Sequence, residues 1–168
     1  SDEVLTYSDL VLKGNKLAQA LKKKGIGRGD VFTILLRNHP EVIIAQYAAS
    51  ALGAVIVPVD PRTKGDKLIY QIKDSNSKGV IFAGEFMGNM EKVLPAIPDL
   101  NFVSVMNRDY FEGVDTSKYQ GMEEILEGPE APGLVPDQHS LNDPFMIVYT
   151  SGTTGNPKGV TSKADRFL

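Results

Sequence analysis

The sequence predicts an α/β fold, in which a mainly parallel sheet carries helices on both of its faces. Short runs of β-branched and apolar residues alternate along the chain with longer segments of helical periodicity. Each passage from one predicted strand to the next contains a helix, as the crossover between parallel strands requires. The chain has 168 residues, of which 42% are hydrophobic, so one packed core is within its reach.

The first half of the chain shows this alternation most clearly. Thr6 or Ser8 can cap the first helix, and the run Lys22–Lys24 followed by Gly25 is typical of its end. The same lysine run could also form an anion-binding patch, although a solvated helix end is the simpler interpretation. The elements expected next are a strand over 31–36, a helix that starts near Pro40 and covers 41–52, a strand over 54–57, a helix over 66–74 and a strand over 79–83.

The second half is less regular. We expect a helix over 85–94, which Pro95 and Pro98 end, and a strand over 100–105. Residues 107–142 are rich in Glu, Gly, Pro and Asp, which favours a poorly structured surface excursion with one short helix around 122–126. A strand over 145–149 then leads into a glycine-rich loop. In parallel sheets ligands bind at the carboxyl ends of strands, so this loop is placed for binding.

The segment from Tyr149 to Val160, Y-T-S-G-T-T-G-N-P-K-G-V, is the strongest functional signal. Its glycines let the backbone approach an anion, and consecutive N–H groups can form an anion-binding concavity. Hydroxyl side chains add donors, and Lys158 adds a positive charge. The spacing differs from the Walker A motif, which disfavours a nucleotide-binding module of P-loop type. A simple turn between two strands would explain the glycines, but not the Pro-Lys-Gly run after them.

This segment resembles the phosphate loop of the adenylate-forming superfamily, which includes acyl-CoA synthetases, peptide-synthetase adenylation domains and luciferases. Similar motifs lie at 5–10, 29–31, 38–41, 51–62 and 74–81, so the resemblance extends over nearly the whole chain. It is closer to acyl-CoA ligases, including those of fatty-acid and carnitine type, than to peptide synthetases. The tail from Thr161 to Leu168 departs from the family's usual continuation.

The resemblance implies an ATP-dependent, AMP-forming ligase. A carboxylate would attack the α-phosphate of ATP, and a thiol, usually that of CoA, would then take the acyl group. ATP, Mg²⁺ and CoA are the cofactors expected of the intact enzyme. No catalytic residue is assigned within this chain. The residues that the resemblance assigns to phosphate binding are Thr150, Ser151, Gly152, Thr153, Thr154, Gly155 and Lys158. For Thr150 the alternative is that it only ends the strand.

The resemblance also predicts how the chain is organised. Family members are several times longer, and this sequence ends shortly after Lys158. We therefore expect residues 1–168 to be an N-terminal fragment of the large adenylation domain, without ligase activity of its own. The alternative is a non-catalytic α/β scaffold or interaction domain that retains a phosphate-binding loop. Protection of the loop amides by ATP would separate the two hypotheses.

Composition and isolated residues narrow the possibilities further. The chain has no cysteine, which excludes disulfides, thiolate metal sites and a cysteine nucleophile. A net charge of −3 gives no broad positive field for nucleic acid. No apolar run is long enough to span a membrane, and the start of the chain lacks a signal-peptide pattern, so we expect a cytoplasmic protein. His39 and His139 are expected on surface loops, with no metal site.

Two further residues beside these motifs have a structural and a functional interpretation. Arg62 follows a proline in a turn and could bind an anion, but a surface or structural ion pair is the favoured interpretation. Tyr149 ends the strand before the loop and is expected to pack rather than to take part in catalysis.

Overall fold

The computed structural model describes residues 5–106, 117–129, 142–150 and 156–163. In this part of the chain seven strands form a single sheet. They are β1 (Val31–Leu35), β2 (Val55–Pro58), β3 (Ser77–Ala83), β4 (Phe102–Met106), β5 (Gln120–Gly121), β6 (Pro144–Thr150) and β7 (Lys158–Lys163). The strand order is β5-β4-β3-β1-β2-β6-β7. All neighbours pair in parallel except β6 and β7, which pair antiparallel, so the predicted mainly parallel sheet is confirmed.

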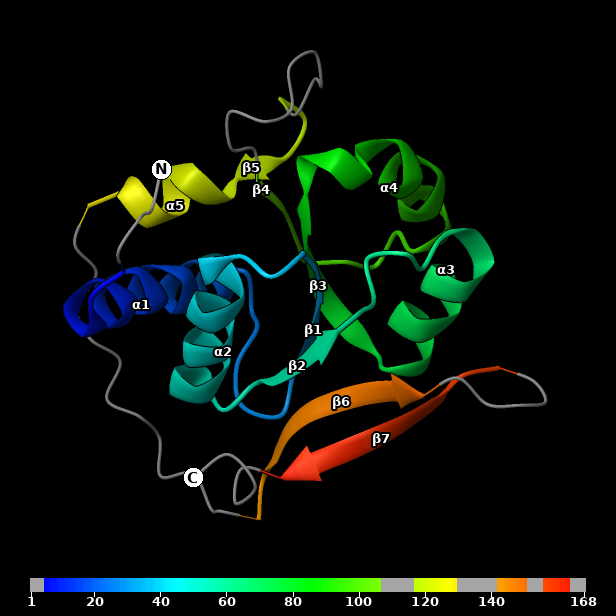
Figure 1. Ribbon diagram of the computed structural model, residues 1–168, viewed down its shortest axis with the longest axis horizontal. Coiled ribbons are helices and arrows are strands. Elements are labelled where there is room, and N and C mark those ends of the chain that lie inside the picture. Colours follow the sequence, from blue (N-terminus) through cyan, green and yellow to red (C-terminus); the bar gives the residue numbers. More distant parts are fainter. Residues whose placement is uncertain (1–4, 107–116, 130–141, 151–155, 164–168) are drawn as a thin grey trace.

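Helices cover both faces of this sheet, as predicted (Figure 1). They are α1 (Tyr7–Lys23), α2 (Pro40–Leu52), α3 (Gly65–Asp74), α4 (Met87–Val93) and α5 (Met122–Glu127). In Figure 1, α1, α2 and α5 lie on one face, and α3 and α4 lie on the other. Contacts between α1 and α2, between α1 and α5, and between α3 and α4 hold each layer together.

The ends of α1 follow directly from its sequence. The Thr6 side chain accepts a hydrogen bond from the Asp9 N–H at 3.1 Å, and the Asp9 carboxylate accepts one from the Thr6 N–H at 3.0 Å. This reciprocal capping box shows that Thr6, and not Ser8, begins the helix. At the other end the Ile26 N–H donates to the Leu21 carbonyl, and Gly25 has a φ of 78°. This is a Schellman ending, and it turns the chain toward β1.

Some elements differ from the sequence-based expectation. The helix predicted over 85–94 consists of a 3₁₀ turn at Gly84–Phe86, then α4, then a second 3₁₀ turn at Leu94–Ala96. Pro95 lacks an amide hydrogen, so it cannot continue the α-helical bonding. The short helix expected around 122–126 is confirmed as α5. The two-residue strand β5 before it, and the strand β7 near the end of the chain, were not predicted.

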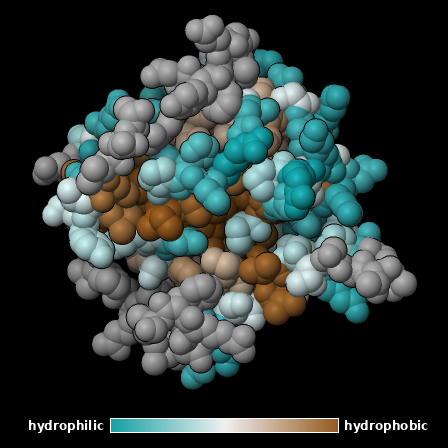
Figure 2. Space-filling view, in the orientation of Figure 1, coloured by the Kyte–Doolittle hydropathy of each residue, from teal (hydrophilic) through white to brown (hydrophobic). Residues whose placement is uncertain are grey.

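The core lies between the sheet and its two helical layers. Phe32, Phe82 and Phe102, on three adjacent strands, are at most 2% exposed. Parallel strands covered on both faces are expected to be mostly apolar, and the buried residues of these strands are, apart from Thr33 and Ser104. Figure 2 shows apolar surface near α1 and α2 and at the β6–β7 hairpin, whereas the side over α3 and α4 is mostly hydrophilic. In the described residues, no helix combines the length and apolar character needed to cross a membrane.

Candidate functional site

The antiparallel hairpin of β6 and β7 carries the glycine-rich segment between its strands. Thr150, the last residue of β6, pairs with Lys158, the first residue of β7, and Tyr149 pairs with Gly159. The predicted phosphate-binding residues Ser151, Gly152, Thr153, Thr154 and Gly155 lie outside the described residues. Lys158 was expected within the loop, but it begins a strand, because residues 158–163 continue the backbone pairing with β6. The pairing of Thr150 with Lys158 therefore forms the mouth of the loop.

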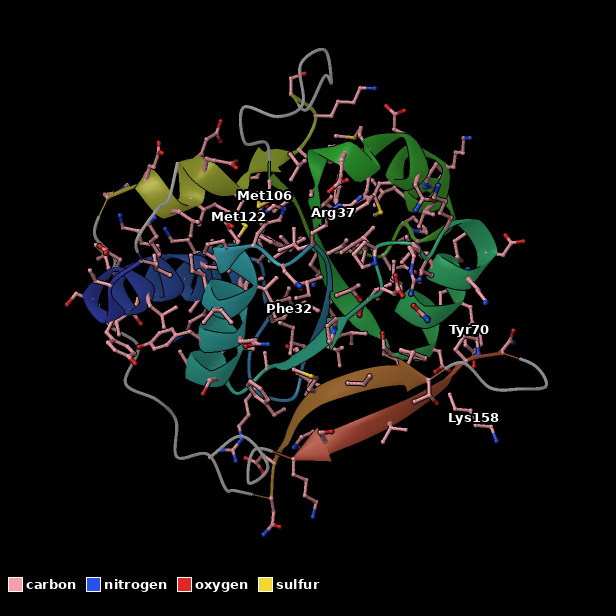
Figure 3. The ribbon with its side chains drawn as sticks, viewed as in Figure 1. Phe32, Arg37, Tyr70, Met106, Met122 and Lys158 are labelled. Carbon is pink, nitrogen blue, oxygen red and sulfur yellow. The ribbon has the colours of Figure 1, made fainter. Side chains whose placement is uncertain are left out.

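Thr150 and Lys158 lie on the same side of this mouth. Directly opposite residues of an antiparallel pair direct their side chains to one face of the sheet. Both residues are exposed to solvent. Figure 3 shows Lys158 at the loop end of the hairpin, with its side chain directed away from the sheet. A hydroxyl donor and an ammonium group can therefore reach the same ligand from the two strands.

A pocket of about 290 Å³ adjoins the mouth of the loop. Three segments line it: the end of β2 with the loop that follows, one side of α3, and the hairpin. Its lining residues are Pro58, Val59, Asp60, Arg62, Thr63, Lys67, Gln71, Tyr149 and Pro157. The pocket lies at the carboxyl ends of β2 and β6, where ligands bind in parallel sheets. Two segments that resembled the same family in the sequence, 51–62 and 149–160, therefore meet at one pocket.

Gln71 provides an unused hydrogen-bond acceptor in this pocket. The residue is only 7% exposed, and its buried Oε1 atom has no hydrogen-bond partner among the described residues. An unpaired buried polar atom costs about 1–3 kcal/mol. Lys67, one turn earlier on α3, is exposed and forms no ion pair with another described residue. The pocket thus suits a ligand that carries both negative charge and a hydrogen-bond donor.

The other cation of the pocket, Arg62, is already paired. Its Nη2 atom lies 2.6 Å from Oδ2 of Asp60, and its backbone N–H donates to Oδ1 of the same carboxylate. Hydrogen bonds from Arg62 lower the pKa of Asp60 to about 2. The interpretation of Arg62 as a member of a surface ion pair is confirmed, which leaves Lys67 and Lys158 as the cations available near the mouth of the loop.

Tyr149 is packed, as expected, and it also makes a hydrogen bond that the sequence did not indicate. Its half-buried hydroxyl donates to Oδ2 of Asp74, the last residue of α3, at 2.6 Å. Burial, together with the neighbouring carboxylate, raises the pKa of Tyr149, so its hydroxyl stays protonated at neutral pH. Gln71 and Asp74 were not predicted as site residues, because each appears in the sequence as an ordinary polar residue of an amphipathic helix.

No protein-made metal site accompanies this pocket in the described part of the chain. No three His, Cys, Asp or Glu side chains gather there in a way that could hold an ion. His39 occupies the N-cap of α2, and His139 lies outside the described residues. Magnesium is usually held by one or two carboxylates together with substrate phosphates. The Asp60 carboxylate is committed to Arg62, so these residues do not fit Mg²⁺ by themselves, and we derive no step through it.

A larger cavity, of about 630 Å³, lies at the opposite edge of the sheet. It is lined by residues 72–73 near the end of α3, by 76–78 around the start of β3 and by 96–101 before β4, so it lies at the amino ends of these strands. Ligands of parallel sheets bind at the carboxyl ends. Size alone therefore does not identify the functional site, and the smaller pocket beside the hairpin is the better candidate.

Comparison with known proteins shows what this chain is similar to. The family model described as "AMP-binding enzyme" matches residues 1–168. An acetyl-coenzyme A synthetase of Shewanella pealeana is 34% identical over an alignment that covers 98% of this chain and 27% of that protein. A medium/long-chain-fatty-acid–CoA/3-oxocholest-4-en-26-oate–CoA ligase of Mycobacterium marinum is 30% identical, over 95% of this chain and 29% of that protein.

A solved structure extends the likeness to the fold. The crystal structure of an anthranilate CoA ligase in complex with anthranoyl-AMP matches with a TM-score of 0.82 and 23% identity. The match covers 99% of this chain and 31% of that protein. This chain therefore spans between a quarter and a third of the length of these three proteins.

Proposed function

The chain belongs to the AMP-binding enzyme family, and on that premise we propose that it holds the phosphates of ATP in a carboxylate-activating ligase. The observation that carries the proposal is the mouth of the loop, where Thr150 and Lys158 face one another across two paired strands beside a polar pocket. In this proposal Ser151, Gly152, Thr153, Thr154 and Gly155 complete the phosphate-binding loop. Residues 1–168 form the N-terminal part of the adenylation domain.

The proposed reaction has two steps. A carboxylate oxygen attacks the α-phosphorus of ATP, the bond from that phosphorus to the bridging oxygen breaks, and pyrophosphate leaves with the negative charge. The thiol of CoA then attacks the acyl carbon of the adenylate, loses its proton and releases AMP. Stabilising the charge on the leaving pyrophosphate lowers the barrier of the first step. Lys158 supplies positive charge, and Thr150 supplies a hydroxyl donor.

The pocket offers further binding groups outside the loop. Lys67 and the Oε1 acceptor of Gln71 lie on the α3 side of the same pocket. We propose that these two groups bind the part of the phosphate-bearing substrate that extends beyond the loop. Anthranoyl-AMP, the compound bound in the matched crystal structure, is an acyl-adenylate, the class of compound that the proposed first step forms.

The names of the relatives support a substrate class. The matched proteins include an acetyl-coenzyme A synthetase and a medium/long-chain fatty-acid–CoA ligase. We propose a carboxylic acid as substrate, CoA as acyl acceptor and a role in fatty acid metabolism. We also propose a cytoplasmic location.

Replacement of Lys158 tests this function. In the full-length enzyme we expect Lys158→Ala to slow ATP–pyrophosphate exchange about ten- to a hundredfold, because one charge-assisted contact to the leaving group is lost. Lys163→Ala is the matched control, since it removes a lysine from the other end of β7, where the ammonium bonds to Asn142 at 3.3 Å. An unchanged exchange rate in Lys158→Ala, with normal folding, would overturn the proposal.

A binding measurement separates this function from a non-catalytic scaffold. We expect ATP to slow hydrogen exchange of the amides at 150–158, because the phosphates accept hydrogen bonds from them. Equal exchange with and without saturating ATP would favour the scaffold. Amides of the central strands serve as the internal control, since they are buried in either case.

A further inference from the structure

Asp74 joins α3 to the strand that leads into the loop. Its Oδ2 atom accepts a hydrogen bond from the Tyr149 hydroxyl at 2.6 Å, across 75 residues of sequence. Its Oδ1 atom accepts one from the Tyr70 hydroxyl at 3.2 Å, within the same helix. Figure 3 shows Tyr70 on the side of α3 toward the loop end of the hairpin, where Lys158 lies. One carboxylate therefore bonds to two phenols, and only one of them lies on the hairpin.

The bond between Tyr149 and Asp74 is a strong one of its kind. An O–H donor to a carboxylate typically lies at about 2.5–2.7 Å and makes a stronger bond than neutral pairs do. The phenol is half-buried, and burial with the nearby carboxylate raises its pKa, so Tyr149 keeps its proton. The donor is thus present throughout the neutral pH range.

The registered backbone pairing that joins the hairpin to the rest of the sheet is short. Strands β2 and β6 share a single registered pair, Ile56 with Met146, whereas β1 and β2 share four. Tyr149 is three residues beyond Met146, toward the loop. Its side-chain bond to α3 therefore attaches the hairpin where the registered pairing with β2 has already ended.

The ring of Tyr149 is held from the other strand as well. Tyr149 pairs with Gly159 of β7, and a Cβ atom added to that glycine would lie 3.2 Å from Cζ of the ring. The ring therefore lies against the backbone of Gly159. Hydroxyl and ring together set the position of Tyr149. The next pair along the hairpin, toward the loop, is Thr150 with Lys158.

We propose that Asp74 is a positioning residue, which acts through Tyr149 to hold the root of the loop so that Thr150 and Lys158 are aligned on the phosphates of ATP. This inference rests on the proposed phosphate-binding role of the loop. Asp74 contacts no reacting atom in the proposal. Without its bond the loop root would have to be ordered when ATP binds, and the apparent affinity for ATP would fall by the fraction of time that it is misaligned.

The test is a set of hydroxyl and carboxylate replacements in the full-length enzyme. We expect Tyr149→Phe and Asp74→Asn each to raise the KM for ATP roughly three- to tenfold in pyrophosphate exchange. The KM for the carboxylate should stay within about twofold in both, because the loop root does not contact it in the proposal. The double variant should be no worse than the poorer single one, since Asp74→Asn weakens the same bond that Tyr149→Phe removes.

Tyr70→Phe is the matched control, because it removes a hydroxyl from the same carboxylate without touching the hairpin. We expect its KM for ATP to change less than about twofold, because the lost bond lies within α3 and does not reach the hairpin. A rise in Tyr70→Phe equal to that in Tyr149→Phe would overturn the proposal. A lowered melting temperature of Tyr149→Phe with an unchanged ratio of the two KM values would also overturn it, because a purely structural bond would give that result.

A second measurement does not depend on ATP. In the chain without nucleotide, Tyr149→Phe should speed hydrogen exchange at the amides of 156–163, while those of β1 and β3 keep their rates. Equal exchange in both proteins would overturn the positioning role. The two proposals also fail separately. An unchanged pyrophosphate exchange rate in Lys158→Ala would contradict the phosphate-binding function. A slowed exchange rate in Lys158→Ala, together with an unchanged KM for ATP in Tyr149→Phe, would contradict only the role of Asp74.

Discussion

The central strands and the β6–β7 hairpin belong to one sheet but have opposite surroundings. Phe32 and Ile34 of β1 are at most 2% exposed, whereas Val148 of β6 and Val160 of β7 are 39% and 53% exposed. Parallel strands need helical crossovers, and these cover both faces of the sheet. A hairpin needs no crossover, and in the part of the chain that the structure describes Val148 and Val160 remain exposed on it, although Met146 is buried. The covered strands form the scaffold, and the hairpin carries Thr150 and Lys158, which we propose bind phosphate.

The sharpest test of this difference compares one apolar residue from each region. We expect Phe32→Ala to lower the free energy of unfolding by about 3–5 kcal/mol, through lost burial and a cavity. Val160→Ala, on the exposed hairpin, should change it by less than about 0.5 kcal/mol. Chemical denaturation of the two variants beside the parent chain measures both values. Similar losses at the two positions would show that the hairpin is covered as fully as the core.

A smaller effect is expected where the scaffold's helices meet. A Cβ atom added to Gly14 of α1 would lie 2.2 Å from Cδ1 of Tyr47 on α2, an impossible approach. We expect Gly14→Ala to destabilise the chain by about 1–3 kcal/mol through overpacking, although alanine is the better helix former. Gly88 of α4 has open space around it, so Gly88→Ala should instead stabilise by about 0.5–1 kcal/mol. If thermal melting shows the same sign for both variants, the contact between α1 and α2 is looser than described.

The smallest effect concerns the loop after β2, where Asp60 and Arg62 form an exposed ion pair beside the hairpin. The pKa of Asp60 falls from its ordinary 3.8 to about 2. A lowered carboxyl pKa means that the pair stabilises the fold above pH 3.8 and that this contribution disappears as the pH falls through about 2. In an NMR titration of the Asp60 carboxyl at low salt we expect a midpoint near 2, and a return toward 3.8 in Arg62→Ala. A midpoint near 3.8 in the parent chain would contradict the pair.

Much of the scaffold could be predicted because its signals are local. Thr6 and Gly25 marked the ends of α1, and Pro40 marked the start of α2, through backbone geometry that short sequences encode. The apolar runs of the central strands were recognisable because burial on both faces demands them. The loop segment from Tyr149 to Val160 was recognisable because its glycines, hydroxyls and lysine occur together.

The hairpin was harder to predict because its signals depend on partners. Strand β7 contains a single large apolar residue, Val160, and becomes a strand through its pairing with β6. Gln71 and Asp74 acquire their importance only where α3 packs beside β6, since nothing in the helix itself distinguishes them. A polar residue of an amphipathic helix has the same local pattern whether it faces solvent or a binding pocket.

By itself the sequence determined the alternation of helices and strands up to β4, most of the helix ends, the apolar strands of the core and the glycine-rich segment that we propose binds phosphate. These follow from propensity, periodicity and turn chemistry, which act over a few residues. The tertiary structure alone decided the strand order, the antiparallel return of β7, the pocket that joins 58–63 to the hairpin, and the bond from Asp74 to Tyr149. These depend on contacts between distant segments, which no short-range pattern records.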